Sequence, residues 1–388
     1  MNYYLNVIKR EISYFSKSRT AWALMLIIPI FTCFLICQIF KEGSPKNLPI
    51  GVMDFDDSEF SRMLTRDIQA MPSCDVRKVV TSLSEGKNLI VRGDIYALIV
   101  IPRDFQKNLY LMKNPKLVFY YNNQTILIGG IISKDITTLA KTLMVGIDAQ
   151  MRMKKGLPKD VSIKSANLVA VDEHIASNPY LNYQYFLSLI SFGHILQIMV
   201  LFVSVWSFGR EFRYGKTKEW LQCANNSIII AFLGKLTPYF FIFSITFFII
   251  YFMYFGLYNA PFRGDYFFIV LNTLTFIATC LSLGALFVSF NGNFRYSLSS
   301  AAFYCAMGFA FAGVTFPVIS MPLVARFYSD LLPLTYYIRG MIDQTLKGVP
   351  SHYNLGNIYA MFVLMILGFL SLYRLKKLAM DESRWYQI

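Results

Sequence analysis

The stretch "YFLSLISFGHILQIMVLFVSVWSF", Tyr185–Phe208, decides the class of this protein. It contains no Asp, Glu, Lys or Arg and is longer than the ~20 residues that an α-helix needs to cross a bilayer. The residues that follow, Gly209–Trp220, read "GREFRYGKTKEW" and carry the charges that the apolar stretch lacks. This abrupt change predicts a membrane-spanning helix that ends in a basic loop.

The composition of the whole chain agrees with this prediction. The 388 residues are 55% hydrophobic and only 15% charged, whereas soluble domains are typically about 25% charged. The formal net charge is +14. In a membrane protein such an excess is typical of basic cytoplasmic loops, so no nucleic-acid partner is expected.

Six stretches are long and apolar enough to be transmembrane helices, which predicts an α-helical polytopic membrane protein. The first occupies residues 20–40, and the other five lie in a membrane region of residues 185–373. The first is expected to be an uncleaved anchor, because its apolar run exceeds that of a signal peptide. The six apolar cores are Ala21–Phe40, Tyr185–Phe208, Leu236–Tyr258, Phe267–Phe290, Ser297–Phe316 and Leu355–Tyr373.

Basic residues in the short loops predict the orientation of the chain. They cluster before the first span, between the second and third spans, and after the sixth. Both termini are therefore expected inside, with a cytoplasmic tail at 374–388 and the long segment 41–184 outside. The basic residues are Lys9, Arg10, Lys17, Arg19, Arg210, Arg213, Lys216, Lys218, Lys235, Arg374, Lys376, Lys377 and Arg384.

The segment 41–184 alternates short β-rich runs with helical ones, beginning "LPIGVMD" and then "SEFSRMLTRDIQAM". This alternation predicts an extracytoplasmic α/β or α+β domain inserted between helices 1 and 2. A strand is expected to end at Asp54, with Asp57 or Ser58 capping the helix that follows.

Two further segments have helical character without spanning length. Residues 1–19 place Leu5, Ile8, Ile12 and Phe15 on one face, which predicts an amphipathic helix at the cytoplasmic membrane interface. Residues 317–347 are apolar but interrupted by prolines, so we expect a re-entrant or interfacial hairpin. A plain extracellular loop is the alternative for that segment.

The "GKT" in the basic loop is not a phosphate-binding loop. Five residues separate Gly209 from Gly215 where the motif requires four, and Arg210 stands where its first glycine should be. "DFDDSE" (54–59) lacks the glycine and glutamate of a calcium loop, and "VDEHIA" (171–176) gives a poor geometry for shared ligation. We therefore expect no catalytic, cofactor-binding or metal site in this chain.

The expected spans contain no carboxylate, which argues against coupling to a proton or sodium gradient. Their notable polar residues include His194 and Gln197, three positions apart on one helix face. Hydrogen bonding between helices is the preferred interpretation, and contact with a substrate on its path is the alternative. A passive channel is not excluded by this reasoning.

The basic loop, residues 209–235, combines charges with Trp220 and Leu221. That composition is typical of docking into a groove on a soluble protein, with the aromatic side chain as the anchor.

Taken as a whole, the chain resembles the permease subunit of a type-2 ABC exporter, in the multidrug-efflux-like bacterial group with a large outer domain. The resemblance is carried by the order of "LPIGVMDFDDSEFSRML", "GDIYALIVIPRDFQKNL", "GREFRYGKTKEWL", "GVTFPVISMP" and "LLPLTYYIRGMIDQTLKG". It implies that the basic loop is the coupling helix region, seated on an ATP-binding partner. The implied coupling residues are Arg210, Glu211, Gly215, Thr217 and Glu219, with Trp220 as the anchor.

The resemblance also implies partners and a location. Two cytoplasmic ATPase subunits would bind ATP and Mg, and a second permease copy would form a homodimer or heterodimer. A periplasmic adaptor and an outer-membrane channel are further expected partners. The complex would export a hydrophobic or amphipathic small molecule across the bacterial cytoplasmic (inner) membrane. The alternatives are a passive channel, a gradient-driven carrier, or a membrane-anchored ligand sensor.

Overall fold

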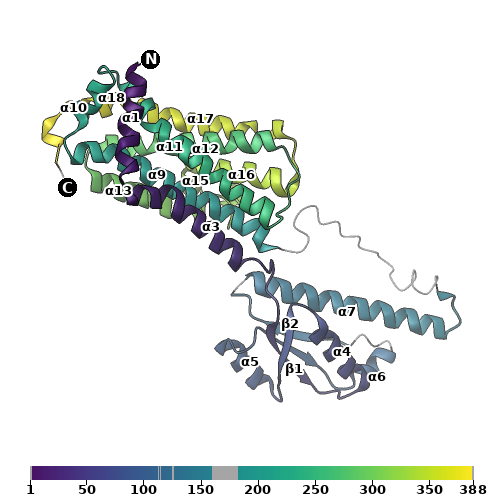
Figure 1. The fold of residues 1–388 in the computed structure, drawn as a ribbon. Coiled ribbons are helices and arrows are strands. Elements are labelled where there is room, and N and C mark those ends of the chain that lie inside the picture. The colour runs from purple at the N-terminus through teal and green to yellow at the C-terminus, as the bar shows by residue number, and fades with distance from the viewer. Residues whose placement is uncertain (1, 112, 114, 125, 160–181, 387–388) are drawn as a thin grey trace. The chain divides into compact units, whose positions relative to one another are not determined.

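The computed structural model describes residues 2–111, 113, 115–124, 126–159 and 182–386 (Figure 1). The chain forms two compact units, each of which is considered by itself. The sheet unit comprises Ser44–His174, and the helical unit comprises Met1–Gly43 together with Ile175–Ile388. The "VDEHIA" stretch lies outside the described residues.

Within its described residues the sheet unit contains four strands and four helices, as the alternating sequence pattern predicts. The strands have the order β2-β1-β3-β4, in which β1 is parallel to β2 and β3, and β4 is antiparallel to β3. The elements are β1 (Leu48–Asp54), α4 (Glu59–Ala70), β2 (Cys74–Val79), α5 (Leu83–Arg92), β3 (Ala97–Ile101), α6 (Phe105–Tyr110), β4 (Val118–Tyr121) and α7 (Ile126–Lys154).

Alternation along the central strands supplies both faces of the sheet unit with apolar side chains. Ile99 of β3 packs with Leu64 of α4 and Ile132 of α7 on one face. Leu98, its neighbour in sequence, is buried on the other face together with apolar residues of α5. The sheet therefore lies between two helical layers.

The turn after β1 confirms the predicted helix cap. The Asp54 carboxylate accepts hydrogen bonds from the backbone N–H of Asp56 and from the Ser61 hydroxyl. Ser58 caps α4, with its side chain accepting from the Ser61 N–H and the Ser61 side chain accepting in return. Asp54 and Ser58 of "DFDDSE" thus shape a strand-to-helix turn, and the Asp56 carboxylate accepts from the Phe105 N–H of α6.

The helical unit begins with α1 (Asn2–Ser16) and consists almost entirely of helices. The long helices are α2 to α3 (Arg19–Ile39), Gln184–Ser188 continuing into α9 (Leu189–Arg213), α11 (Ile228–Tyr251) continuing through Phe252–Leu257, α12 (Tyr266–Asn291), and α17 (Leu355–Leu370) followed by α18 (Leu372–Met380). The shorter ones are α10 (Thr217–Cys223), α13 (Phe294–Ala306), α14 (Gly308–Phe311), α15 (Leu323–Asp330) and α16 (Pro333–Ile342) with its extension Asp343–Lys347.

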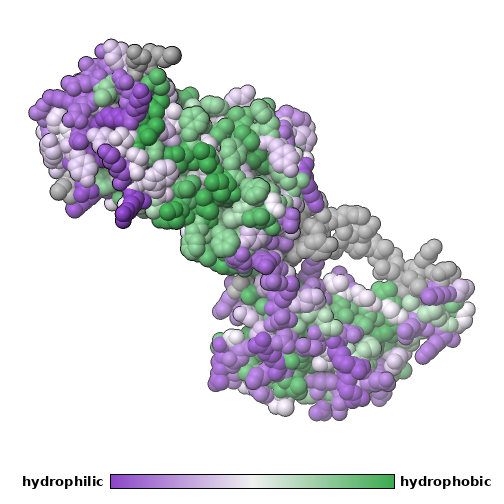
Figure 2. Space-filling model, viewed as in Figure 1, coloured by the Kyte–Doolittle hydropathy of each residue, from purple (hydrophilic) through white to green (hydrophobic). Residues whose placement is uncertain are grey.

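Five helices in the described part of the chain are long and apolar enough to cross a membrane. They match five of the six expected spans, although α9 continues to Arg213 and α11 begins at Ile228, beyond the expected limits. The basic loop at 209–235 is consequently helical over most of its length. Figure 2 shows an apolar surface over the middle of this unit and a hydrophilic end that carries α10 and α18. We call this hydrophilic end, which includes the basic loop at 209–235, the basic end.

The remaining expected span, Ser297–Phe316, is not one continuous helix. α13 ends at Ala306, and a break at Met307 separates it from the short α14. Gly313 then adopts a positive φ of 80°, which ends the helical path. A count of six spanning helices is therefore not confirmed.

The segment expected at 317–347 folds back into the helical unit. The Tyr328 hydroxyl donates to the carbonyl of Tyr304 on α13 (2.6 Å). On α16, Tyr337 stacks on Phe276 of α12 with ring centroids 4.2 Å apart. This ring is buried, so α16 belongs to the core of the unit and a plain loop does not describe it.

Candidate functional site

Five charged side chains from three separate elements meet inside the basic end. We call them the charge cluster. Two come from α1, two from the end of α9 and one from the start of α11. Its members are Arg10, Glu11, Arg210, Glu211 and Lys235.

The two carboxylates join all three elements. The Glu211 carboxylate accepts from both terminal guanidinium nitrogens of Arg10, Nη1 and Nη2, at 2.8 and 2.7 Å. Glu11 accepts from Arg210 at 3.0 Å. Lys235 contacts both acids, at 2.5 Å from Glu11 and 2.7 Å from Glu211. Each helix is thus held to the other two by charge-assisted hydrogen bonds.

The cluster is largely buried. Glu11 and Lys235 have no exposed surface and Glu211 retains 1%, while the side chains of Arg10 and Arg210 are 11% and 10% exposed. The hydroxyl of Tyr239 donates to Glu11 at 3.1 Å. The guanidinium groups of Arg10 and Arg210 both lie over the ring of Tyr14, and the ring centroid is 4.3 Å from Arg210 Cζ. Such contacts replace part of the hydration that the ions lose on burial.

Three cations face two carboxylates, so the cluster carries one net positive charge. Burial by itself lowers the pKa of Arg10. The hydrogen bonds and charge of Glu211, with the charge of Glu11, outweigh burial and raise the pKa of Arg10 above its usual value. Arg10 is therefore charged at neutral pH.

The α10 helix packs directly on the charge cluster. The Trp220 ring lies 5.3 Å from the Lys235 ammonium and meets Phe208 edge-on at 5.8 Å. Its indole N–H donates to the carbonyl of Ala231 at 3.2 Å. Trp220 has no exposed surface. The expectation that this side chain anchors a partner does not fit its position, because it is part of the chain's own core.

Most of the other predicted coupling residues are buried or structural, and one has an exposed side chain. Thr217 is buried, and its hydroxyl donates to the carbonyl of Ala379 on α18 (2.7 Å). Gly215 forms the turn between α9 and α10 with a φ of 63°. Arg210 and Glu211 lie in the charge cluster. Glu219, in the first turn of α10, is the one that presents an exposed side chain.

His194 and Gln197 lie together on α9 beside the break between α13 and α14. A Cβ on Gly308 would be 3.4 Å from His194 Nδ1 and 3.7 Å from Gln197 Nε2. Gln197 Nε2 has a weak contact with the sulfur of Cys305 (3.8 Å). Among the described residues, His194 Nδ1 and Gln197 Oε1 find no hydrogen-bond partner. His194 and Gln197 were expected to form hydrogen bonds to neighbouring helices, and the weak contact from Gln197 to Cys305 is the one such bond among the described residues.

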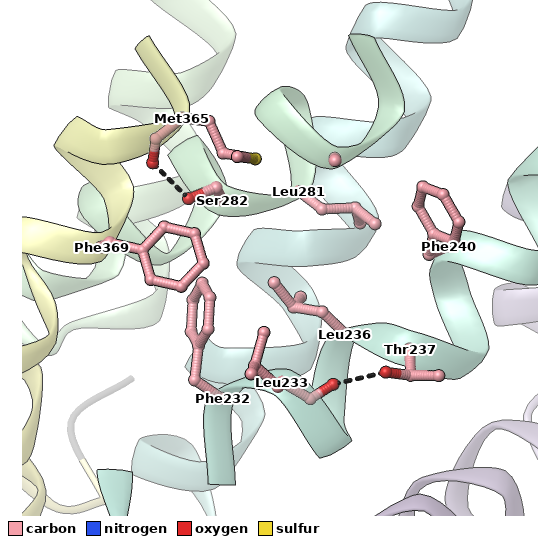
Figure 3. Close-up of a pocket in the computed structure, with 10 residues that line it drawn as sticks. Phe232, Leu233, Leu236, Thr237, Phe240, Leu281, Ser282, Met365 and Phe369 are labelled. Carbon is pink, nitrogen blue, oxygen red and sulfur yellow. Dashed lines mark hydrogen bonds between the residues drawn. The ribbon is translucent and has the colours of Figure 1, made fainter. Parts of the chain in front are cut away.

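A cavity of about 150 Å³ lies between α11, α12 and α17 (Figure 3). Ser282 donates its hydroxyl to the carbonyl of Met365 (2.9 Å), and Thr237 donates to that of Leu233 (2.7 Å). Both polar side chains are therefore engaged in backbone bonds, and the cavity offers apolar contact. Its other lining residues are Phe232, Leu236, Phe240, Ala278, Leu281 and Phe369.

The sequence pattern does not distinguish three members of the charge cluster. Arg10 and Lys235 read as ordinary basic residues of loops or polar faces, and Glu11 lies beside Arg10 with no feature that sets it apart. A signal existed in α1, where Val7, Glu11 and Phe15 share one face at four-residue spacing. These three are the buried face, whereas Leu5 and Ile12 are 44% exposed.

In the part of the chain that is described, no group of three His, Cys, Asp or Glu side chains could hold a metal ion.

A family model described as "ABC-2 family transporter protein" matches residues 19–373. ABC transporter G family member 20 of Dictyostelium discoideum is 25% identical over 357 residues, which cover 88% of this chain and 46% of that protein. The probable multidrug ABC transporter permease YbhS of Escherichia coli K12 is 21% identical over 337 residues, 86% of this chain and 85% of its own length. The chain thus spans about half the length of the Dictyostelium relative.

Proposed function

Because this chain belongs to the ABC-2 family of transporter proteins, we propose that it is the permease subunit of an ABC exporter, driven by separate ATPase subunits. One observation carries the proposal: α10 packs on a charge cluster that holds α1, α9 and α11 together. A force applied to α10 would be transmitted to three helices at once.

The mechanism follows from the rigidity of this contact. Trp220 lies against Lys235, and the backbone N–H of Lys216 donates to the Glu211 carbonyl at 2.8 Å. These two contacts connect α10 to the end of α9 and to α11, so a displacement of α10 would be passed on to both helices. An ATPase that binds ATP and Mg would push or pull α10 as it closes and opens, and the cluster would transmit that motion into the membrane helices.

The orientation and assembly form part of the same proposal. The basic end is assigned to the cytoplasm of a bacterial cell, and the sheet unit to the outer side of its inner membrane. Two permease copies, identical or similar, would enclose the path, with two ATPase subunits beneath them. A periplasmic adaptor and an outer-membrane channel are proposed partners of the sheet unit.

The cargo is proposed to be a hydrophobic or amphipathic small molecule. The printed name of the Escherichia coli relative, a probable multidrug permease, supports this class. His194 and Gln197 supply unpartnered polar atoms beside the α13–α14 break, and we propose that they contact the polar part of the cargo. A His194→Ala variant should lose stimulation of ATP hydrolysis by cargo while keeping the basal rate of hydrolysis.

The proposal is tested by isolating the tagged chain gently from its native membrane and identifying the bound proteins by mass spectrometry. A stoichiometric P-loop ATPase supports it. An intact preparation without any ATPase, whose transport proceeds without ATP, would instead establish a passive channel or a gradient-driven carrier.

A further inference from the structure

We propose that the segment Asp381–Tyr386, which follows α18, forms one composite docking surface with α10 for the ATPase subunit. The inference rests on the function proposed above. It adds to the docking surface a part of the chain that lies far from the basic loop in sequence.

Backbone and buried contacts hold this segment against the turn between α9 and α10. The backbone N–H of Tyr386 donates to the carbonyl of Phe212, at the end of α9, at 3.0 Å. Two residues before the segment, the carbonyl of Ala379 accepts from the buried Thr217 hydroxyl at 2.7 Å. The segment is thus fixed near both of its ends.

Side-chain contacts continue along the segment. Lys218 of α10 forms an ion pair with Glu382, and its ammonium lies 5.3 Å from the Trp385 ring. The side chains of Lys218 and Glu382 are 52% and 64% exposed. An exposed pair of this kind adds about 0–1 kcal/mol. Its main consequence is to keep both charges together on the surface, where a partner can reach them.

The turn at Gly215 makes room for an aromatic ring. A Cβ at this position would lie 2.5 Å from the Tyr386 hydroxyl, and the φ of 63° favours glycine. Tyr386 itself is 67% exposed. A tyrosine whose backbone is fixed and whose ring is open to solvent is well suited to anchor an interface. We assign to Tyr386 the anchoring role that the sequence indicated for Trp220.

The chemistry of the composite surface fits a soluble protein partner. Lys218 and Glu219 of α10 and Glu382 of the segment are exposed charges of both signs, and the side chains of Tyr214 and Tyr386 are 55% and 67% exposed. Aromatic residues inside a polar, charged rim are typical of protein–protein interfaces. A membrane surface fits less well, because the carboxylates of Glu219 and Glu382 would then lie against anionic headgroups, which repel them.

One comparison tests the proposal. The ATPase retained per chain is quantified by mass spectrometry for wild type, for a chain lacking residues 381–388, and for Gly215→Ala. Both variants should retain about tenfold less ATPase, as expected when an anchor residue is lost.

Gly93→Ala is the matched control for Gly215→Ala. Gly93 also has a positive φ (80°), but a Cβ there would meet nothing within 4 Å. Both substitutions place a Cβ on a residue with positive φ, and only Gly215→Ala displaces Tyr386. Thermal unfolding of each variant checks that the membrane helices remain folded. Gly215→Ala in the shortened chain should cause no additional loss of ATPase.

The outcomes separate this inference from the proposed function. If wild type retains no ATPase, the permease proposal and this inference are both overturned. If wild type retains ATPase and the shortened chain retains as much, this inference alone is overturned. The same conclusion follows if Gly215→Ala retains as much ATPase as Gly93→Ala.

Discussion

Replacing Glu211 by Gln should destabilise the helical unit, because it removes a buried charge but little volume. Glu211 neutralises Arg10 through two hydrogen bonds and Lys235 through a third. Without it, three cations face only Glu11. Removing one partner of a buried ion pair costs about 3–5 kcal/mol. The retained amide oxygen can still accept one bond, so we expect a loss of about 3 kcal/mol.

The assay is equilibrium unfolding in mixed micelles of dodecyl maltoside and sodium dodecyl sulfate, followed by circular dichroism. Glu219→Gln is the matched control, since it makes the same chemical change at an exposed position. We expect it to alter the free energy of unfolding by less than about 0.5 kcal/mol.

A second substitution tests the electrostatic origin of the loss. Lys235→Met in the Glu211→Gln chain returns the cluster to one net positive charge. The double variant should therefore lose about 1–3 kcal/mol less unfolding free energy than the sum of the losses in the two single variants. The reasoning would be refuted if Glu211→Gln destabilised the protein no more than Glu219→Gln does. Strict additivity in the double variant would show that the charges do not act as a unit.

Three other predictions follow from separate contacts. Trp220→Ala should destabilise the protein by about 3–5 kcal/mol in the same micelle titration, because it empties a buried aromatic site; an unchanged titration would mean that α10 is not packed on the core. Gly368→Ala should lower the melting temperature, since its Cβ would overlap Ser282 of α12, whereas Gly356→Ala, which meets nothing within 4 Å, should leave it nearly unchanged. Burial raises the pKa of the Cys74 thiol above its usual value near 9, so the folded state holds this proton more tightly and the free energy of unfolding should fall as pH rises above 9. Cys74→Ala should weaken this fall. An identical pH profile in the variant would exclude the thiol as its source.

Much of the architecture could be predicted from local patterns. "LPIGVMD" is β1 itself, and Ser58 caps α4 as its position after the strand indicates. Charge-free apolar runs likewise located five long helices. Where the rule failed, the cause was local: Ser297–Phe316 is apolar enough to span, but the helix breaks at Met307 and the positive φ of Gly313 ends the helical path.

The interior of the basic end could not be predicted in the same way. Lys235 reads as a loop cation because the positive-inside pattern explains it without any partner. Its burial depends on Glu11 and Glu211, which lie 224 and 24 positions away. Trp220 illustrates the converse, since an aromatic residue among charges fits a docking surface and a buried packing site equally well. Only the tertiary contacts distinguish the two.

The central claim is that α10 receives an ATPase subunit. The most direct test is a photo-reactive amino acid at Glu219 in intact cells, with the same group at the exposed Lys87 of the sheet unit as control. The account predicts an adduct with a P-loop ATPase from position 219 and none from position 87. No ATPase adduct at 219, or equal adducts at both positions, would contradict it.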